Sequence, residues 1–137
     1  MLLLDSEALS ALATGPVARR DRVRALIIEM RKRELPVATV AAVLAETVRG
    51  RPQDAAVFSG MRRDRVVVHP VDTRTGVRAG QFLGACRLDS TRAVDAFVVA
   101  VADLAGGALV ATVDPDDLCK LADHAHRVAV VSLLPGK

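Results

Sequence analysis

Four acidic residues of this 137-residue chain lie beside or inside apolar segments, where a carboxylate is unusual. They are Asp5, Glu46, Asp95 and Asp114. An isolated carboxylate in apolar surroundings costs roughly several kcal/mol of desolvation unless it is paired, protonated or bound to a cation. We therefore expect the four carboxylates to meet around a hard divalent cation, Mg²⁺ or Mn²⁺, because such ions prefer oxygen ligands.

A divalent cation held by carboxylates would favour phosphoryl chemistry. It lowers the pKa of a bound water, and a second cation can stabilise the leaving oxygen. No other residue pattern in the chain offers a nucleophile with a matched base. The sequence contains neither GxxxxGK[ST] nor a GxGxxG after an expected strand. Cys119, His124 and His126 do not have the spacing of a standard zinc site.

Three of the four acids also have a simpler structural interpretation. Asp5 and Asp114 each precede an expected helix, and aspartate is a good N-cap. Glu46 could pair with Arg49 three residues later, although its apolar neighbours favour burial of this helix.

Asp95 is the strongest single indication of a functional site. It lies in the stretch from Ala93 to Ala102, which is apolar nearly all round, as expected for a helix packed inside the fold. Aspartate is a poor helix former in mid-segment, and only Arg92 lies at helical spacing to pair with it.

Strands and helices alternate along the whole chain. Strands are expected at residues 2–4, 37–39, 65–71, 108–113 and 128–131, and helices at 5–13, 16–34, 40–49, 52–63, 73–88, 90–104 and 115–124. This alternation predicts an α/β fold with a mostly parallel sheet covered on both faces. The length fits one domain, residues 1–137. Ligands of such folds bind beyond the carboxyl ends of the strands, and Asp5 and Asp114 both lie there.

The positive charge is concentrated in the first part of the chain. Residues 1–78 contain 14 Lys/Arg against 9 Asp/Glu, which gives +5, whereas residues 79–137 contain 5 against 7, which gives −2. Arginine predominates, which suits contact with phosphate or carboxylate groups, although a solvated helix surface is the simpler interpretation of any one cluster. Because the apolar runs are short and no signal peptide is recognisable, we expect a cytoplasmic protein with no membrane span. The two cysteines are too few for a disulfide framework and do not form a CxxC motif, so we expect them to be reduced.

Three segments taken in order resemble a known family: LLLDSEALSALA, VATVAAVLAETVRG and STRAVDAFVVAVADLAGGALVATVDPDDLCKLA. They resemble PIN-domain ribonucleases, most closely the toxins of VapBC-type toxin–antitoxin pairs. The resemblance implies a three-layer α/β/α sandwich, usually a homodimer, that cleaves single-stranded regions of RNA with Mg²⁺ and is inhibited by a cognate antitoxin. Asp5 and Asp95 would be the principal metal ligands, with Glu46 and Asp114 completing the catalytic acidic pocket. Val113 departs from the polar residue that many relatives have there.

Two other classes of function are also compatible with a cluster of acids. In a non-catalytic module, the acidic pocket would bind the basic tail of a partner protein for regulation. A receiver-like phosphoacceptor domain would also hold Mg²⁺ with clustered acids, and the third expected strand ends near Asp72. That class requires a lysine after a late strand, and the final strands offer no suitable one.

Overall fold

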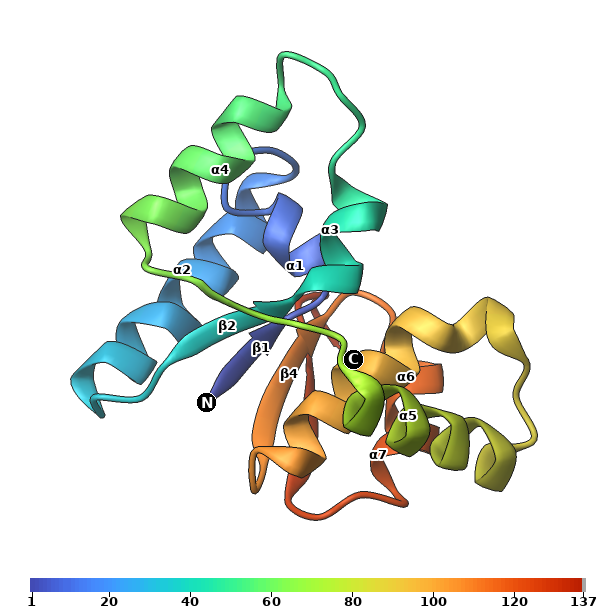
Figure 1. Cartoon of the computed structure of the whole chain (residues 1–137). Helices are drawn as coiled ribbons and strands as arrows, with labels where there is room; N and C mark the ends of the chain where they lie inside the picture. Colours follow the sequence, from blue (N-terminus) through green and yellow to red (C-terminus); the bar gives the residue numbers. More distant parts are fainter. Residues whose placement is uncertain (137) are drawn as a thin grey trace.

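A computed structural model describes residues 1–136 and confirms the α/β fold. The central sheet is parallel throughout, as Figure 1 shows. Its strands are β1 (Leu2–Leu4), β2 (Val37–Val40), β3 (Val67–His69), β4 (Ala108–Thr112) and β5 (Val128–Ser132), in the order β3-β2-β1-β4-β5.

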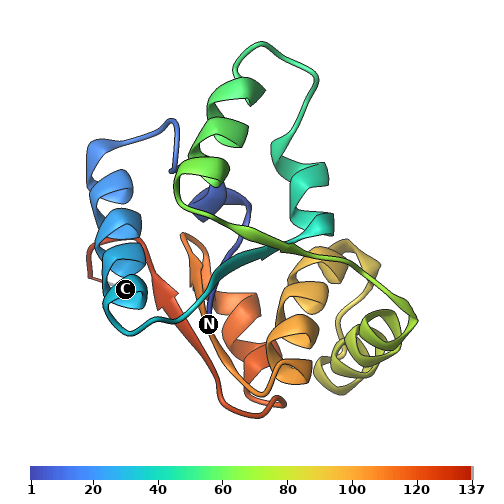
Figure 2. The same ribbon diagram turned by 60° about the vertical axis from the view of Figure 1, so that its left-hand side comes forward.

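Helices cover both faces of the sheet, so the three-layer α/β/α arrangement is also confirmed (Figures 1 and 2). Helix α2 packs against β1 on one face, and α6 and α7 pack against the sheet on the other, with α5 beside them. The helices are α1 (Ser6–Ser10), α2 (Val17–Lys32), α3 (Ala41–Thr47), α4 (Asp54–Arg63), α5 (Thr73–Cys86), α6 (Ala93–Leu104) and α7 (Pro115–Ala122), with a 3₁₀ turn at Ser90–Arg92.

The hydrophobic core lies on both sides of β1. The three leucines of β1 are completely buried, and α6 buries every residue from Val98 to Ala102. A helix that is apolar nearly all round is stable only when neighbours cover it, and α6 contacts the sheet together with α3, α5 and α7. Asp95 in its first turn is therefore held by a rigid, central element.

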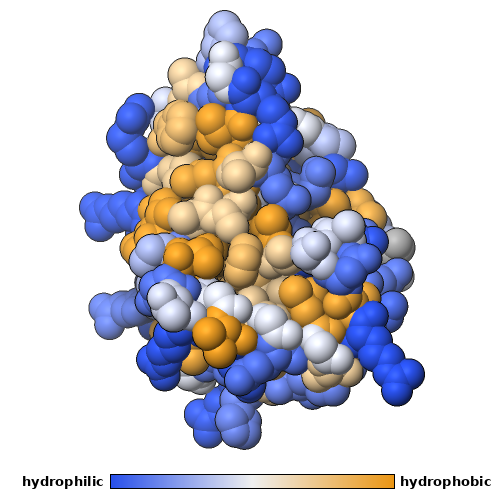
Figure 3. All heavy atoms as spheres, turned by 45° about the vertical axis from the view of Figure 1, so that its right-hand side comes forward, coloured by the Kyte–Doolittle hydropathy of each residue, from blue (hydrophilic) through white to orange (hydrophobic). Residues whose placement is uncertain are grey.

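The third strand differs from the expectation. It spans only Val67–His69 rather than 65–71, and it is an edge strand. Val67 is 50% and Val68 39% exposed, so the prediction of strands buried on both faces is wrong for this one. An edge strand has a neighbour on one side only, and the local run of β-branched residues does not distinguish an edge from a centre. Figure 3 shows that hydrophobic residues also gather on one face of the molecular surface.

The order of the strands places a topological switch point next to β1. The chain goes from β1 to β2 and β3 on one side, and later returns to place β4 and β5 on the other side. Connections that leave two adjacent strands in opposite directions open a crevice at their carboxyl ends, where open α/β sheets bind ligands. In this protein that point lies between β1 and β4.

No helix within residues 1–136 has both the length and the apolar character needed to cross a bilayer.

Candidate acidic site at the carboxyl edge of the sheet

All four predicted acids lie near this switch point, close enough for their charges to interact with that of Asp95. Asp5 directly follows β1 and Asp114 follows β4, and the parallel register pairs Leu4 with Ala111 just before them. Glu46 lies near the end of α3 and Asp95 in the first turn of α6, and these two helices pack against each other (Figure 1). The arrangement was expected for Asp5 and Asp114 from the strand pattern, but only the folded chain brings α3 and α6 to the same place.

Asp5 has two roles that the sequence presented as alternatives. Its Oδ1 accepts the backbone N–H of Ala8 at 3.0 Å, so it is the N-cap of α1. Its side chain is also buried, since the residue is only 8% exposed. Burial raises its pKa from 3.8 to about 6, with further contributions from the charges of Asp95 and Glu7, and hydrogen bonds with Thr112 and Ala8 partly oppose the rise.

Thr112 is the buried residue that links the two strand-end acids. It is 1% exposed, its Oγ1 accepts the backbone N–H of Asp114 at 3.1 Å and donates to the Asp114 carbonyl at 3.3 Å, and the same hydroxyl helps to lower the pKa of Asp5. On the other side of β1, the Thr39 hydroxyl donates to the carbonyl of Leu4 at 2.7 Å. These hydroxyls fix the backbone at the strand ends on both sides of Asp5, which preorganises the acidic site.

Asp95 is half-buried, and its pKa is also raised from 3.8 to about 6. Burial is the largest cause, and the carboxylates of Glu46, Asp117 and Asp114 add to it, while Arg92 opposes it. Because Asp95 also raises the pKa of Asp5, the site behaves as a set of mutually repelling carboxylates.

A fifth acid, Asp117 in the first turn of α7, also belongs to this site, because its charge raises the pKa of Asp95. Its Oδ2 lies 2.9 Å from Nε of Arg92, and its Oδ1 lies 3.6 Å from Nζ of Lys120. Arg92, the one cation at helical spacing from Asp95, therefore forms its ion pair with Asp117 instead. The spacing of Asp117 from Asp114, three residues along one helix, was the signal that could have identified it.

The burial expected for all four acids is confirmed for Asp5, is only partial for Asp95, and is wrong for Glu46 and Asp114, which are exposed. Asp114 occupies the N-cap position of α7, but its carboxylate makes no capping hydrogen bond. Glu46 makes no ion pair with Arg49, because the Arg49 guanidinium donates to the carbonyls of Ala45 and Val48. Both exposed carboxylates thus remain available at the carboxyl edge of the sheet.

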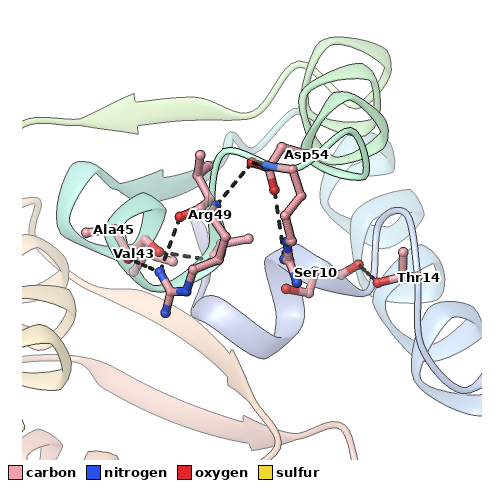
Figure 4. A network of polar contacts seen from close by, with 9 residues as sticks. Ser10, Thr14, Val43, Ala45, Arg49 and Asp54 are labelled. Atoms are coloured by element: carbon pink, nitrogen blue, oxygen red, sulfur yellow. Dashed lines mark hydrogen bonds and ion pairs between the residues drawn. The ribbon is translucent and has the colours of Figure 1, made fainter.

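The loop after Glu46 is held by one carboxylate, Asp54, as Figure 4 shows. Its Oδ2 accepts the backbone N–H groups of Arg49 at 3.1 Å and Arg51 at 3.0 Å. Burial alone would raise the pKa of Asp54, but these hydrogen bonds outweigh burial and lower it. This loop fixes the end of α3 and thereby the position of Glu46.

The donor atoms of the site fit Mg²⁺ in kind, because all of them are carboxylate oxygens. Their placement is looser than a preformed cage: within residues 1–136, no group of three or more His, Cys, Asp or Glu residues is placed to hold a metal ion. Mg²⁺ commonly keeps several waters and uses only one or two protein carboxylates. Asp5, which is buried, and Asp95, which is half-buried, are the pair that would serve.

Many of the basic residues expected to bind a polyanion have internal partners. Arg22 donates to the carbonyl of Ser132 at 2.9 Å, and Arg63 pairs with Asp64 at 2.9 Å. Within residues 1–136, the side chains without an ion pair or a hydrogen bond include those of Arg20, Arg24 and Arg65. The positive charge of the first half of the chain is therefore partly structural.

No protein-family model and no curated protein sequence matches this chain.

Proposed function

We propose that the protein is a Mg²⁺-dependent endoribonuclease that cleaves single-stranded regions of RNA, as the toxin of a toxin–antitoxin pair. The observation that supports this most directly is the neighbouring pair of acids at the carboxyl edge of the sheet, the buried Asp5 and the half-buried Asp95, each with its pKa raised to about 6. Such repulsion destabilises the fold unless a cation neutralises it, so the pair is best explained by a function that uses one.

The four acids would have different roles, according to how far each is exposed to solvent. Asp5 and Asp95 would hold Mg²⁺ (or Mn²⁺), which supplies a water of lowered pKa and a positive charge for the phosphodiester oxygens. Without that cation, the acidic pocket would repel an RNA phosphate. Glu46 and Asp114 lie exposed at the rim, where their carboxylates can accept a proton from water.

The proposal also includes a homodimer and a protein antitoxin. Large apolar side chains on the surface offer area for such contacts, among them Val67, Val68 and Val77, of which Val77 is 58% exposed. The mass of the purified protein in solution, measured by light scattering, tests the dimer. Co-purification with the product of a neighbouring gene tests the antitoxin.

A second candidate function is a catalytically silent module whose acidic pocket binds a basic tail of a partner. It is favoured by the absence, within the described part of the chain, of three metal-ligating residues already in place. The two candidates predict different responses to metal, because a basic tail would compete with Mg²⁺ for the same carboxylates whereas RNA cleavage requires the ion.

The test uses partner-free protein on total RNA, with Mg²⁺, with Mn²⁺ and with EDTA. We expect cleavage with either metal and none with EDTA. Asp95→Asn should reduce the rate by roughly 100-fold or more. Asp116→Asn is the matched control, because it removes the same charge from an exposed position at the start of α7 and should retain activity. Asp95→Asn protein that still cleaves in metal-replete buffer would contradict the assignment.

A further inference from the structure

A second cluster of charged side chains lies at the opposite edge of the sheet, where β4 and β5 begin. A cavity of about 530 Å³ is bounded there by the first turns of α5, the last turn of α6 and the residues that precede the two strands. Its charged lining consists of Arg74, Arg78, Asp103, His126 and Arg127. Asp103 is eight residues after Asp95 on α6, so this cavity is about 12 Å away along the helix axis.

Arg78 is held in place from several sides. Its Nε lies 3.0 Å from Oδ2 of Asp103, its Nη1 donates to Oε1 of Gln81 at 3.1 Å, and its guanidinium lies 4.3 Å from the ring centroid of Phe82. Asp103 is itself fixed, because its Oδ1 accepts the backbone N–H of His126 at 2.7 Å. An arginine fixed in this way loses little side-chain entropy on binding an anion.

Several N–H groups of the cavity arginines have no hydrogen-bond acceptor in the described part of the chain. Nη2 of Arg78 makes no hydrogen bond within residues 1–136, and Arg74 and Arg127 form no ion pair there. Three arginines and one carboxylate, that of Asp103, line the cavity, and Asp72 lies near Arg74 outside this lining, so the cavity carries excess positive charge.

The backbone keeps Arg127 close to the cavity. Arg127 adopts a left-handed conformation with φ 55°, and its carbonyl oxygen lies 2.8 Å from the position that a Cβ on Gly107 would occupy. A side chain on Gly107, which itself has φ +125°, would push this segment away. The start of β5 is thus packed against the start of β4, with Arg127 at the junction.

We propose that this cavity is a binding site for a phosphate group, as a phosphate monoester or as a phosphodiester of a single-stranded nucleic acid. The donor groups of a guanidinium match the several oxygens of a phosphate group. Three guanidinium groups offer more donors than the two oxygens of a single carboxylate ligand would accept. The volume lies within the range of small-molecule sites, so a nucleoside attached to the phosphate can be accommodated beside Leu104. The proposal is independent of the acidic site and of RNA cleavage.

Two variants share a backbone conformation and separate this proposal from a general charge effect. Arg127→Gln removes a cavity arginine, whereas Arg87→Gln removes an exposed arginine at the end of α5 that also has φ 55°. Phosphate, adenosine monophosphate and a single-stranded RNA octamer would each be titrated into ¹⁵N-labelled wild type and both variants in EDTA. EDTA prevents metal-dependent cleavage, so the outcome does not depend on whether the protein is a nuclease.

We expect saturable shifts of the backbone amides of Gly106, His126 and Arg127 in the wild type. The Kd should rise about tenfold in Arg127→Gln and stay unchanged in Arg87→Gln, since each charge-assisted hydrogen bond is worth about a tenfold change. If the RNA octamer binds, the slope of log K against log salt concentration should be smaller by about one in Arg127→Gln than in the wild type. This outcome identifies the phosphodiester as the ligand. Binding of phosphate and the mononucleotide alone identifies the monoester. The proposal is overturned if these amides do not shift with any of the three, or if both variants weaken binding equally.

Discussion

Replacing Asp5 by asparagine should stabilise the protein, even though the residue is a buried helix cap. The Oδ1 of asparagine can still accept the N–H of Ala8, which Asp5 accepts at 3.0 Å, and asparagine caps helices as well as aspartate. What the substitution removes is the negative charge, which burial and Asp95 disfavour in the folded state.

The size of the effect follows from the pKa. It rises from 3.8 to about 6 on folding, and since each pH unit corresponds to about 1.4 kcal/mol, ionising Asp5 in the folded protein costs about 3 kcal/mol. Because the folded pKa is raised, this carboxyl favours folding most below pH 3.8, progressively less up to about pH 6, and to a constant lower extent above that value. Asparagine does not titrate, so the advantage of the variant should appear over this window.

The assay is urea unfolding followed by circular dichroism at pH 4, 6 and 8, in EDTA at fixed ionic strength. Some of the gain is offset because asparagine is also a buried polar group, so we expect Asp5→Asn to be about 1–3 kcal/mol more stable than wild type at pH 8. At a chain length of 137 residues, this corresponds to a rise in Tm of roughly 4–10 °C. At pH 4 the difference should nearly vanish.

The exposed Asp116 gives the control. Asp116→Asn should produce no stabilisation at pH 8 and a loss of at most about 1 kcal/mol, because the carboxylate lies in the first turn of α7 where the helix dipole favours it. An Asp5→Asn variant that is destabilised at pH 8, or stabilised equally at pH 4 and pH 8, would refute the account of Asp5 as a buried, repelled charge.

Three further predictions concern the metal, a tight backbone contact and the core. Mg²⁺ should raise the free energy of unfolding by about 2.7 kcal/mol at a hundredfold excess over its Kd, measured by thermal unfolding. The same titration of Asp95→Asn should show a much smaller rise, and equal rises would exclude Asp95 as a ligand. Gly107→Ala should destabilise by about 1–3 kcal/mol in urea unfolding, because its φ is +125° and a Cβ would meet Arg127 at 2.8 Å. Phe82→Ala should cost about 3–5 kcal/mol in the same assay, since Phe82 is 1% exposed in the core, and a loss below about 1 kcal/mol would contradict that packing.

The amino-acid sequence by itself determined the alternation of strands and helices and the fold class. Apolar runs, helical periodicity and residues such as Pro16, Gly50 and Pro115 act over a few neighbours, so they predict elements close to those observed. The same local patterns placed Asp5 and Asp114 at strand ends, where a parallel sheet must bring them to one edge.

Tertiary structure alone decided which of these elements are neighbours. The order β3-β2-β1-β4-β5 makes β3 an exposed edge and places the topological switch point between β1 and β4. Tertiary structure also pairs Arg92 with Asp117 rather than with Asp95. It assembles the second cavity from residues that lie far apart in the chain, such as Arg74 and Arg127. Strand order and side-chain pairing depend on how whole surfaces pack and on the closure of long loops, and neither leaves a short-range pattern in the sequence.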